Sequence, residues 1–515
     1  MAEFRVESDL MGDVVVPLNV HYGAQTQRAF DNFQISGIRF PRRFIRALGL
    51  IKAAAAQTNQ ELVLLTDDIA DAIITVAMEV ADGQWDAEFV LDIFQTGSGT
   101  STNMNANEVI ASRANELIGG KRGDVQPVRP IDDVNRCQSS NDVIPTTIHL
   151  AALDGIDREL LPAMEILAQG LEAKADEFQN VLKTGRTHLQ DAVPIMLGQE
   201  FGGWASQLRH GIARIVAARV HLLELPIGGT ALGTGLNAHP EFADRICKLL
   251  GQLATPGLRR ADNAFEAIGS RDALVEASGA LRTVAVSLTK IAGDIRLLSS
   301  GPRTGFAEIS IPELQPGSSI MPGKVNPVMC EMMIQVCAQV IGNDTAVTLG
   351  GMMGQLDLNV MMPLMAHNLL QSITILAAAC RVFDEKCVSS GPAVRDNPNN
   401  VHGISANQER CRLLVESSLM PVTALVPMLG YKIAARIARE SFRTGKTIRE
   451  IVLAENLVPA TELDSLLDLT SMTRPPVALE FGARADQATT NETGPLLDAV
   501  NRSSLDRWRN EGGHK

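Results

Sequence analysis

The clearest pattern along the chain is a run of apolar positions between Leu274 and Leu298. The spacing of these positions alternates between three and four, which is the repeat of a helix packed in a left-handed bundle. The eight positions are Leu274, Ala277, Leu281, Val284, Leu288, Ile291, Ile295 and Leu298. The pattern predicts a helix of about 25 residues and roughly 38 Å. The sequence SSGP that follows marks its end.

Three further stretches carry helical periodicity and predict long helices. They are Val143–Gln179, Gly198–Glu224 and the segment after Pro363, where Leu369, Ile373 and Leu376 recur. Aromatic residues make up only 4% of the chain, so aliphatic side chains and methionine carry its 45% hydrophobic content. That composition favours helices packed closely on helices. We therefore predict a mainly α fold, an elongated helical bundle. Because a narrow bundle leaves apolar flanks, we also expect an oligomer.

The length of 515 residues predicts more than one domain. We expect a mixed helical and loop domain over 1–138, a central long-helix domain over 139–400, a small C-terminal helical domain over 401–472 and a mobile tail over 473–515. In the third of these, Thr461 is predicted to be the N-cap of a short helix. The last segment is predicted to be a tail because its apolar periodicity is poor.

Charge and hydropathy exclude several classes of partner. The formal net charge is −13 and no dense run of Lys or Arg occurs, so neither nucleic acid nor an anionic membrane is expected as the main partner. No apolar run approaches the ~20 residues of a membrane span. The N-terminal sequence MAEFRVESDLMGD is charged and lacks the apolar core of a secretory signal.

The seven cysteines and nine histidines show no metal-binding spacing. Two cysteine pairs are seven residues apart, which is two helical turns and not the C-x₂-C of a zinc site. The cysteines are Cys137, Cys247, Cys330, Cys337, Cys380, Cys387 and Cys411. No H-E-x-x-H motif occurs. An odd number of cysteines in a large chain predicts free thiols and a cytoplasmic protein.

Four stretches of small polar residues, here called polar islands, interrupt the helical pattern. They are TGSGTSTNMNANE (Thr96–Glu108), QSSNDVIPT (Gln138–Thr146), GRTHLQDA (Gly185–Ala192) and GSSIMPGKVNP (Gly317–Pro327, the 317–327 loop). Each is predicted to lie at or near a helix N-terminus, where free amides and the helix dipole favour anions. Their hydroxyls and amides add donors, and Arg186 and Lys324 add positive charge. Together the islands predict a binding site for an anionic ligand.

Any one island has a simpler explanation in capping and turn chemistry, because Ser, Thr and Asn are common there for local reasons. His188 is likewise open to a structural role, although it is the only histidine within an island. The glycine-rich stretch GGTALGTGLN (Gly228–Asn237) lacks the lysine of a P-loop and does not fit G-x-G-x-x-G. We interpret that stretch as a tight turn between helices.

These stretches together resemble motifs of the fumarase/aspartase superfamily. The 317–327 loop is similar to the family's signature loop, and the segments TGSGTSTNMNANEV, QSSNDVIPT, GRTHLQDAVPIMLGQE and GGTALGTGLN follow in the family's order over about Phe4–Thr473. The resemblance implies a homotetramer with a twenty-helix central bundle, in which each active site is built from three chains. It also implies reversible elimination across the C2–C3 bond of a four-carbon dicarboxylate, with no metal or organic cofactor.

The resemblance assigns roles to residues of the islands. It makes Ser318 the general base that removes a proton next to a carboxylate, giving an aci-carboxylate dianion. A serine is a weak base, so it needs donors and Lys324 nearby and a closed loop, for which Gly317 and Gly323 are expected as hinges. Lys324 and Asn326 are expected to hold a substrate carboxylate. The remaining substrate-binding residues implied are Ser98, Thr100, Ser139, Ser140, Asn141, Thr187 and Ser319.

His188 is the family's candidate for the acid, or for the group that orients the leaving group. Glu331 matches a family glutamate that pairs with this histidine. An ordinary first-turn helix glutamate is the alternative for Glu331. The sequence does not decide whether His188 acts as the acid or only orients the leaving group.

One motif departs from the family pattern. Many fumarases carry HPNDDVN, described as a second, peripheral dicarboxylate site, whereas this chain reads RPIDDVN. Arg129 replaces the histidine, and Ile131 replaces the asparagine. Because the Ile131 side chain cannot form hydrogen bonds, we predict that the peripheral site is weak or absent.

Within the superfamily the chain resembles class II fumarases most closely. QSSNDV and NAFEAIGSRDALVEASGAL (Asn263–Leu281) are fumarase-like, whereas Tyr22, RLLSSGP and GQLDLNV (Gly354–Val360) are closer to aspartases. We expect reversible hydration of fumarate to L-malate. Conversion of L-aspartate to fumarate and ammonia is the alternative. A non-catalytic structural relative, like the crystallins of this superfamily, is disfavoured because the residues of the islands are retained together.

Overall fold

The computed structural model describes residues 3–389 and 403–474. The chain divides into two compact units, one of residues 1–185 with 195–418 and one of residues 186–194 with 419–515. The mainly α fold predicted from the sequence is confirmed. The predicted domain boundaries near 138 and 400 stay predictions. The predicted tail from 473 lies outside the described residues, apart from its first two positions.

The N-terminal part of the first unit combines a β-hairpin with helices. Its elements are β1 (Phe4–Asp9), β2 (Gly12–Pro17), α1 (Ala24–Asn32), α2 (Arg42–Glu61), α3 (Asp67–Ala81), η1 (Asp86–Glu88), α4 (Thr100–Leu117) and η2 (Pro130–Val134). The strands β1 and β2 pair antiparallel from Phe4 opposite Pro17 to Asp9 opposite Gly12. The sequence pattern did not indicate this hairpin.

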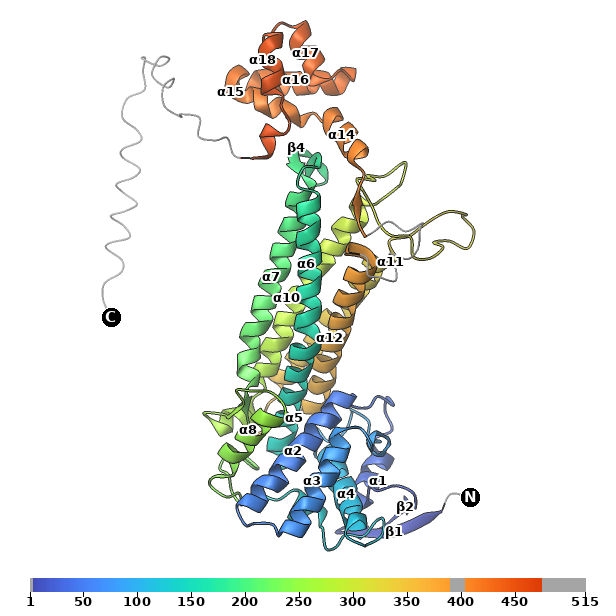
Figure 1. The fold of residues 1–515 in the computed structure, drawn as a ribbon, viewed down its shortest axis with the longest axis vertical. Helices are drawn as coiled ribbons and strands as arrows, with labels where there is room; N and C mark the ends of the chain where they lie inside the picture. The colour runs from blue at the N-terminus through green and yellow to red at the C-terminus, as the bar shows by residue number, and fades with distance from the viewer. Residues whose placement is uncertain (1–2, 390–402, 475–515) are drawn as a thin grey trace, which may run out of the picture. The chain divides into compact units, whose positions relative to one another are not determined.

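Long helices packed side by side form the body of the first unit (Figure 1). They are α6 (Leu161–Glu177), α7 (Leu197–Leu222), α10 (Asp272–Leu298), α11 (Val328–Met352) and α12 (Met362–Phe383). The helix α10 packs against α7 and α11, and α12 packs against α11 and α6. All eight seam positions predicted between Leu274 and Leu298 are buried. The long helices expected from residue 198 and after residue 363 are confirmed as α7 and α12.

The long helix predicted over Val143–Gln179 is confirmed, with a π-helical segment within it that was not predicted. It consists of α5 (Ser140–Gly155), a π-helical segment η3 (Ile156–Leu160) and α6. Pro162 lies in the first turn of α6 and has no amide hydrogen to continue the helical ladder. A single-turn π-helical insertion changes the register of that ladder locally while the chain remains helical.

Short elements connect the long helices. They are β3 (Leu182–Thr187), β4 (Gln190–Met196), β5 (Glu224–Leu225), α8 (Phe242–Leu253), β6 (Arg259–Arg260), α9 (Ala264–Gly269), β7 (Ile309–Ser310), η4 (Asp384–Val388), β8 (Ser405–Ala406) and α14 (Gln408–Ser417). The strands pair as β3–β4, β5–β6 and β7–β8. The stretch Gly228–Asn237 forms turns and bends between β5 and α8. The predicted tight turn is therefore confirmed.

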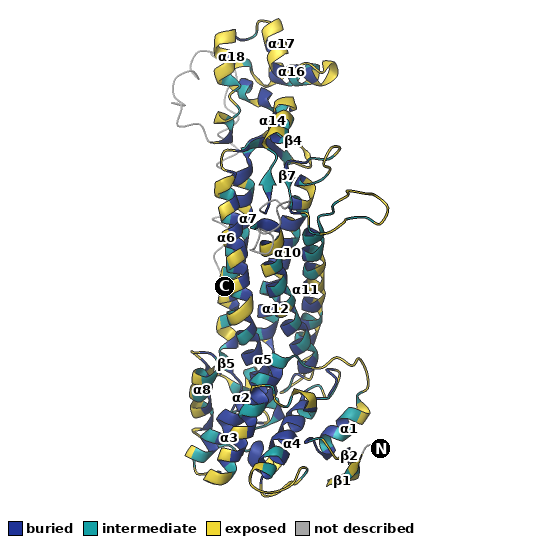
Figure 2. Cartoon of the chain, turned by 45° about the vertical axis from the view of Figure 1, so that its right-hand side comes forward, coloured by how far each residue is buried: buried dark blue, intermediate teal, exposed yellow. Residues whose placement is uncertain are grey.

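One apolar core runs through the first unit from α2 and α3 into the long helices. Figure 2 shows the buried faces of these helices directed toward one another. All seven cysteines lie within the described residues and are buried, and no disulfide joins them there. The segment Met362–Val388 is long and apolar enough to cross a membrane, although the sequence analysis found no such run. Because most of that segment is buried against its neighbours, it is a core helix.

The second unit has a separate small core. Its helices are η5 (Met420–Leu425), α15 (Val426–Leu429), α16 (Tyr431–Thr444), α17 (Ile448–Ala454), α18 (Ala460–Leu466) and η6 (Ser471–Thr473). Thr447 caps α17 through a capping box with Glu450. The N-cap of α18 is Pro459, so the prediction that Thr461 caps this helix is wrong. Pro459 has non-helical backbone angles, φ −55° and ψ 137°, as an N-cap does, and the helix begins at Ala460, before Thr461.

Candidate active site

The 317–327 loop leads directly into α11, where Pro327 is the N-cap. Its two ends are joined by the Gly317 amide, which donates to the Lys324 carbonyl at 2.7 Å, and by the Asn326 side-chain amide, which donates to the Gly317 carbonyl at 2.6 Å. A Cβ atom on Gly317 would lie 2.4 Å from the Lys324 carbonyl oxygen. Glycine is therefore required at position 317 by this close approach. Gly323 has a φ of +76°, which also favours glycine.

Ser318 lies half-buried within this loop, and its hydroxyl is surrounded by backbone donors. The Ser318 Oγ accepts hydrogen bonds from the amides of Ile320 at 3.2 Å and Met321 at 3.0 Å. The following residues, from Ser319 to Lys324, are exposed (Figure 2). Two amide donors on one serine oxygen would stabilise negative charge there.

The first polar island contains the start of α4, as predicted. Gly99 is the N-cap with a left-handed backbone, and Thr100 is the first helical residue. The hydroxyls of Ser98 and Thr100 hydrogen bond to each other at 2.8 Å. Ser98 is buried.

The second island starts α5, and it contacts the first. Ser139 is the N-cap of α5, and its Oγ accepts from the Asn141 amide. The Asn103 side chain, in α4, donates to the Ser140 Oγ at 3.0 Å. A Cβ on Gly99 would lie 2.9 Å from Ile144, so α4 and α5 start against each other. The structure thus brings two islands together that are about 40 residues apart in the sequence.

The third island does not lie at a helix N-terminus, and that prediction is wrong. Gly185–Ala192 belongs to the hairpin of β3 and β4, and the next helix, α7, begins only at Leu197. His188 and Leu189 form its turn with φ values of 55° and 61°. Two-residue hairpin turns need such positive φ values. Thr187 and His188 are exposed.

Glu331 lies in the first turn of α11, where a carboxylate is favoured by the helix dipole. This position is compatible with the ordinary helix-start role as well as with the role implied by resemblance. His188 and Glu331 belong to different compact units of the chain. Their pairing stays a prediction.

Within one chain, the 317–327 loop and the first two islands are attached to opposite ends of α11. The loop precedes its N-terminus, whereas Gly350, near its C-terminus, accepts from the Asn359 side chain at 2.9 Å. The adjoining Val360 lies against Gly97 of the first island. A helix of 25 residues is about 37 Å long. Ser318 and Ser140 of the same chain are therefore not parts of one site.

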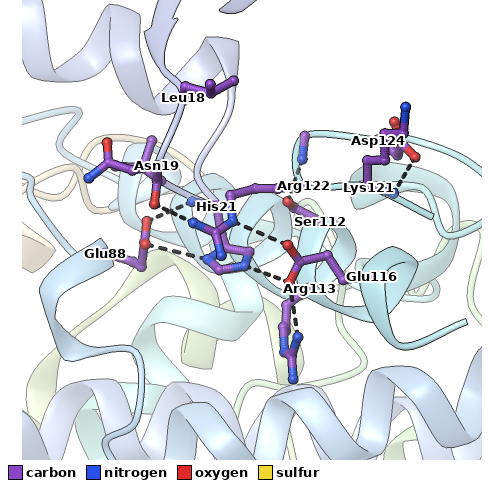
Figure 3. Close-up of polar contacts among 12 residues, drawn as sticks. Leu18, Asn19, His21, Glu88, Ser112, Arg113, Glu116, Lys121, Arg122 and Asp124 are labelled. Atoms are coloured by element: carbon purple, nitrogen blue, oxygen red, sulfur yellow. Dashed lines mark hydrogen bonds and ion pairs between the residues drawn. The ribbon is translucent and has the colours of Figure 1, made fainter. Parts of the chain in front are cut away.

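A buried polar network that sequence analysis missed holds the segment before α1 (Figure 3). His21 is 1% exposed and lies between Glu88, at 3.4 Å, and Glu116, at 3.1 Å. Arg113 and Arg122 also contact Glu116. Although burial opposes ionisation, hydrogen bonds from His21 and Arg113 lower the Glu116 pKa to about 2. The signal that could have revealed the network is a histidine within an apolar and small-residue context.

Arg129, in the RPIDDVN motif, is already paired with two carboxylates of its own segment. Its guanidinium contacts Asp133 at 2.9 Å through two nitrogens and Asp132 at 3.1 Å. A cavity of about 450 Å³ borders it. The side chain of Ile131, which also lines this cavity, is 55% exposed and offers no hydrogen bond. The observed contacts therefore support the prediction that the peripheral dicarboxylate site is weak or absent.

Crystals soaked with L-malate are expected to show no ordered ligand at Arg129, because Asp132 and Asp133 already satisfy the guanidinium and would repel a dianion. The variant Ile131→Asn provides the matched comparison, since it restores the family amide. Ordered malate touching Arg129 and Asp132 in the unchanged protein would refute the prediction.

Within residues 3–389 and 403–474, no group of three or more His, Cys, Asp or Glu side chains is arranged to hold a metal ion. The islands instead offer hydroxyl, amide and ammonium groups. All three kinds of group can donate hydrogen bonds to an anion. The arrangement is suited to binding carboxylates.

Two family models match the chain. The one described as Lyase matches residues 12–342, and the one described as Fumarase C C-terminus matches residues 422–474. The chain is 49% identical over 473 residues to the class II fumarate hydratase of Nitrosomonas europaea, covering 92% of this chain and 100% of the relative. It is 51% identical over 478 residues to that of Mycobacterium tuberculosis, covering 92% and 97%.

Two solved structures are similar over the same extent. A class II fumarase from Schistosoma mansoni has a TM-score of 0.87 at 40% identity, covering 92% of this chain and 99% of that one. A cobalt-bound fumarate lyase:delta crystallin from Brucella melitensis has a TM-score of 0.85 at 44% identity, covering 92% and 100%. The similarity extends over nearly the whole length of each solved structure, and the four islands lie within residues 12–342 that match the family model described as Lyase.

Proposed function

The chain belongs to the lyase family that includes these class II fumarate hydratases, and from this premise we propose that it catalyses the reversible hydration of fumarate to L-malate. The observation that carries the proposal is about 50% identity to class II fumarate hydratases over 92% of the chain. The structure supports it by placing donor-rich islands at the starts of α4, α5 and α11.

The proposed chemistry begins, in the direction of dehydration, with removal of a proton from the carbon next to a carboxylate of L-malate. Ser318, as the alkoxide that the amides of Ile320 and Met321 stabilise, takes this proton and becomes a neutral hydroxyl, and the electron pair of the C–H bond moves onto the carboxylate to form the aci-carboxylate dianion. The C–O bond then breaks, and the leaving hydroxyl is protonated to give water and fumarate. Each step needs donors placed where the negative charge develops.

The islands supply those donors in a protein whose net charge is −13. The free amides of a helix N-terminus attract anions, and α4 and α5 start side by side. Their residues Ser98, Thr100, Ser139, Ser140 and Asn141 are proposed to bind one end of the substrate. Lys324 and Asn326 are proposed to hold a carboxylate at the other end, and Thr187 and Ser319 are proposed to bind the substrate as well. The site is therefore locally positive although the chain is acidic.

The proposed assembly is a homotetramer whose active sites combine residues of three chains. The support within one chain is the separation of the 317–327 loop from the second island by the length of α11. A site that contains both Ser318 and Ser140 consequently requires a second copy. We also propose a cytoplasmic location, which seven buried cysteines without a disulfide among the described residues support.

The leaving group separates this proposal from the ammonia-lyase alternative. Hydroxide must be protonated as it departs, whereas ammonia leaves from a cationic C–N bond and needs little acid. His188 and Glu331 are proposed to polarise a water for that purpose. The aspartase-like segment Gly354–Val360 borders the first island through Gly97, so it is the part of the chain in which an amine preference would arise.

The purified protein is expected to interconvert fumarate and L-malate without ammonia and to release negligible ammonia from L-aspartate. Ultraviolet absorbance of fumarate, followed separately with L-malate and with L-aspartate, measures both reactions. Faster formation of fumarate from L-aspartate would establish the ammonia-lyase alternative. No turnover of either substrate would indicate a structural relative.

A further inference from the structure

Asp142, in the first turn of α5, is a buried carboxylate with no exposed surface and no assigned role in the chemistry. One of its oxygens accepts from the Ser139 amide at 2.9 Å. The other accepts from the amides of Gly228 at 3.0 Å and Thr230 at 2.9 Å. One side chain therefore joins the start of α5 to the glycine-rich turn Gly228–Asn237.

A second contact joins the same two segments. The Asn141 side-chain amide donates to the Ala231 carbonyl at 2.9 Å. Thr230 donates to Asp142 and directly precedes Ala231. Its φ of 56° is uncommon and strained for a β-branched residue. Such a backbone persists only where its surroundings hold it. The turn is thus held against the residues proposed to bind substrate.

Lys52, on α2, supports the same helix start from the opposite side. Its amine has no exposed surface and donates to the side-chain oxygens of Asn135 and Gln138, each at 3.0 Å. Asn103 donates to that Asn135 oxygen at 3.1 Å and to the Ser140 Oγ at 3.0 Å. Lys52 is therefore connected to Ser140 through two intervening side chains.

Lys52 and Asp142 balance each other electrostatically, although no direct ion pair joins them among the described contacts. Burial raises the Asp142 pKa to about 7, and burial lowers the Lys52 pKa to about 7. Each charge opposes the shift of the other. Removing one charge therefore leaves the other buried with only neutral hydrogen-bonding partners, which is costly.

We propose that Asp142 and Lys52 are positioning residues of the active site, which fix Ser139, Ser140 and Asn141 between the Gly228–Asn237 turn and α2. This proposal rests on the proposed function of those three residues. It gives the glycine-rich turn a role in the reaction, because the turn supplies the amides that hold Asp142. A displacement of substrate-binding groups by about 1 Å is enough to slow an enzyme markedly.

The test compares Asp142→Asn, Lys52→Met and the double variant. Each single variant is expected to lose thermal stability, because it leaves one buried charge uncompensated. The double variant removes both charges and is expected to recover most of that loss. In all three variants, kcat/KM is expected to fall on the order of 10-fold relative to the unchanged protein. KM should rise by a larger factor than kcat falls. Activity that recovers together with stability in the double variant would overturn the proposal.

Asp384→Asn is the matched control, because Asp384 is also a buried aspartate. Its carboxylate accepts a hydrogen bond from the Ser389 hydroxyl, which does not belong to an island. It is expected to keep normal KM. Hydrogen exchange of the unchanged protein and of Asp142→Asn provides a readout that needs no turnover. Faster exchange is expected at the amides of Ser139, Gly228 and Thr230. Unchanged exchange at these three amides would refute the proposal that Asp142 holds the start of α5 against the Gly228–Asn237 turn. Lack of fumarate turnover in the unchanged protein would refute only the proposed function.

Discussion

Replacing Ser318 with alanine is expected to lower kcat at least ~10²-fold while changing KM far less, as is typical of losing a general base. The change removes the oxygen that accepts from the amides of Ile320 and Met321. It leaves the loop ends joined, because those contacts use Gly317, Lys324 and Asn326. Steady-state kinetics with L-malate and with fumarate measure the effect in both directions.

Ser310→Ala is the matched control, since Ser310 precedes the loop and bonds to Asn407 outside the islands. Normal kcat is expected for it. The two amides on Ser318 also have a local explanation, because serine hydroxyls commonly accept such bonds in turns. Near-normal turnover of Ser318→Ala would favour the local explanation, in which the Ser318 hydroxyl only stabilises the turn. The general base would then be another residue, and His188 would be the first to test.

The long helices α7, α10 and α12 could be predicted because their apolar positions repeat regularly, whereas periodicity did not locate α4 and α11, which begin at islands. The seam of α10 is buried at every predicted position, since a helix in the middle of a bundle meets partners on several sides. The interruption at η3 was not predicted, because the apolar pattern continues through it and only Pro162 indicates the break. Periodicity therefore located these long helices but not their local irregularities.

The hairpin that carries Thr187 and His188 was mistaken for a helix start. Its turn consists of His188 and Leu189 at positive φ, whereas the usual sequence signal for such a turn is Asn-Gly or Gly. Contacts between segments that are distant in the sequence could also not be predicted. The approach of Gly99 to Ile144 and the bond from Asn103 to Ser140 depend on how α4 packs against α5. Such tertiary contacts leave no local pattern.

The roles of the islands could be assigned only by resemblance, for a physical reason. The 317–327 loop and the second island are separated by α11 within a chain, so no local pattern or single-chain contact relates them. Asp142 and Lys52 were overlooked for the opposite reason. A charged residue within a helical pattern is usually solvent-exposed, and only the structure shows that these two are buried.

Lys324→Ala is expected to lower kcat/KM about 10³-fold, with KM raised and kcat lowered together. The ammonium of Lys324 is exposed in the single chain, and the loop uses only its backbone. The substitution therefore removes the charge while the Gly317–Lys324 hydrogen bond remains. A carboxylate that gains a second negative charge in the intermediate should depend on this ammonium more strongly than the substrate does.

Lys324→Arg separates charge from shape, because arginine keeps the positive charge but replaces a compact ammonium with a planar fork. We expect it to retain binding better than turnover. Lys432→Ala, at an exposed lysine of α16, controls for the loss of a surface charge and is expected to have normal kinetics. If Lys324→Ala raised KM and left kcat unchanged, Lys324 would bind substrate and intermediate equally. Stabilisation of the dianion would then have to come from the amides and hydroxyls of the islands.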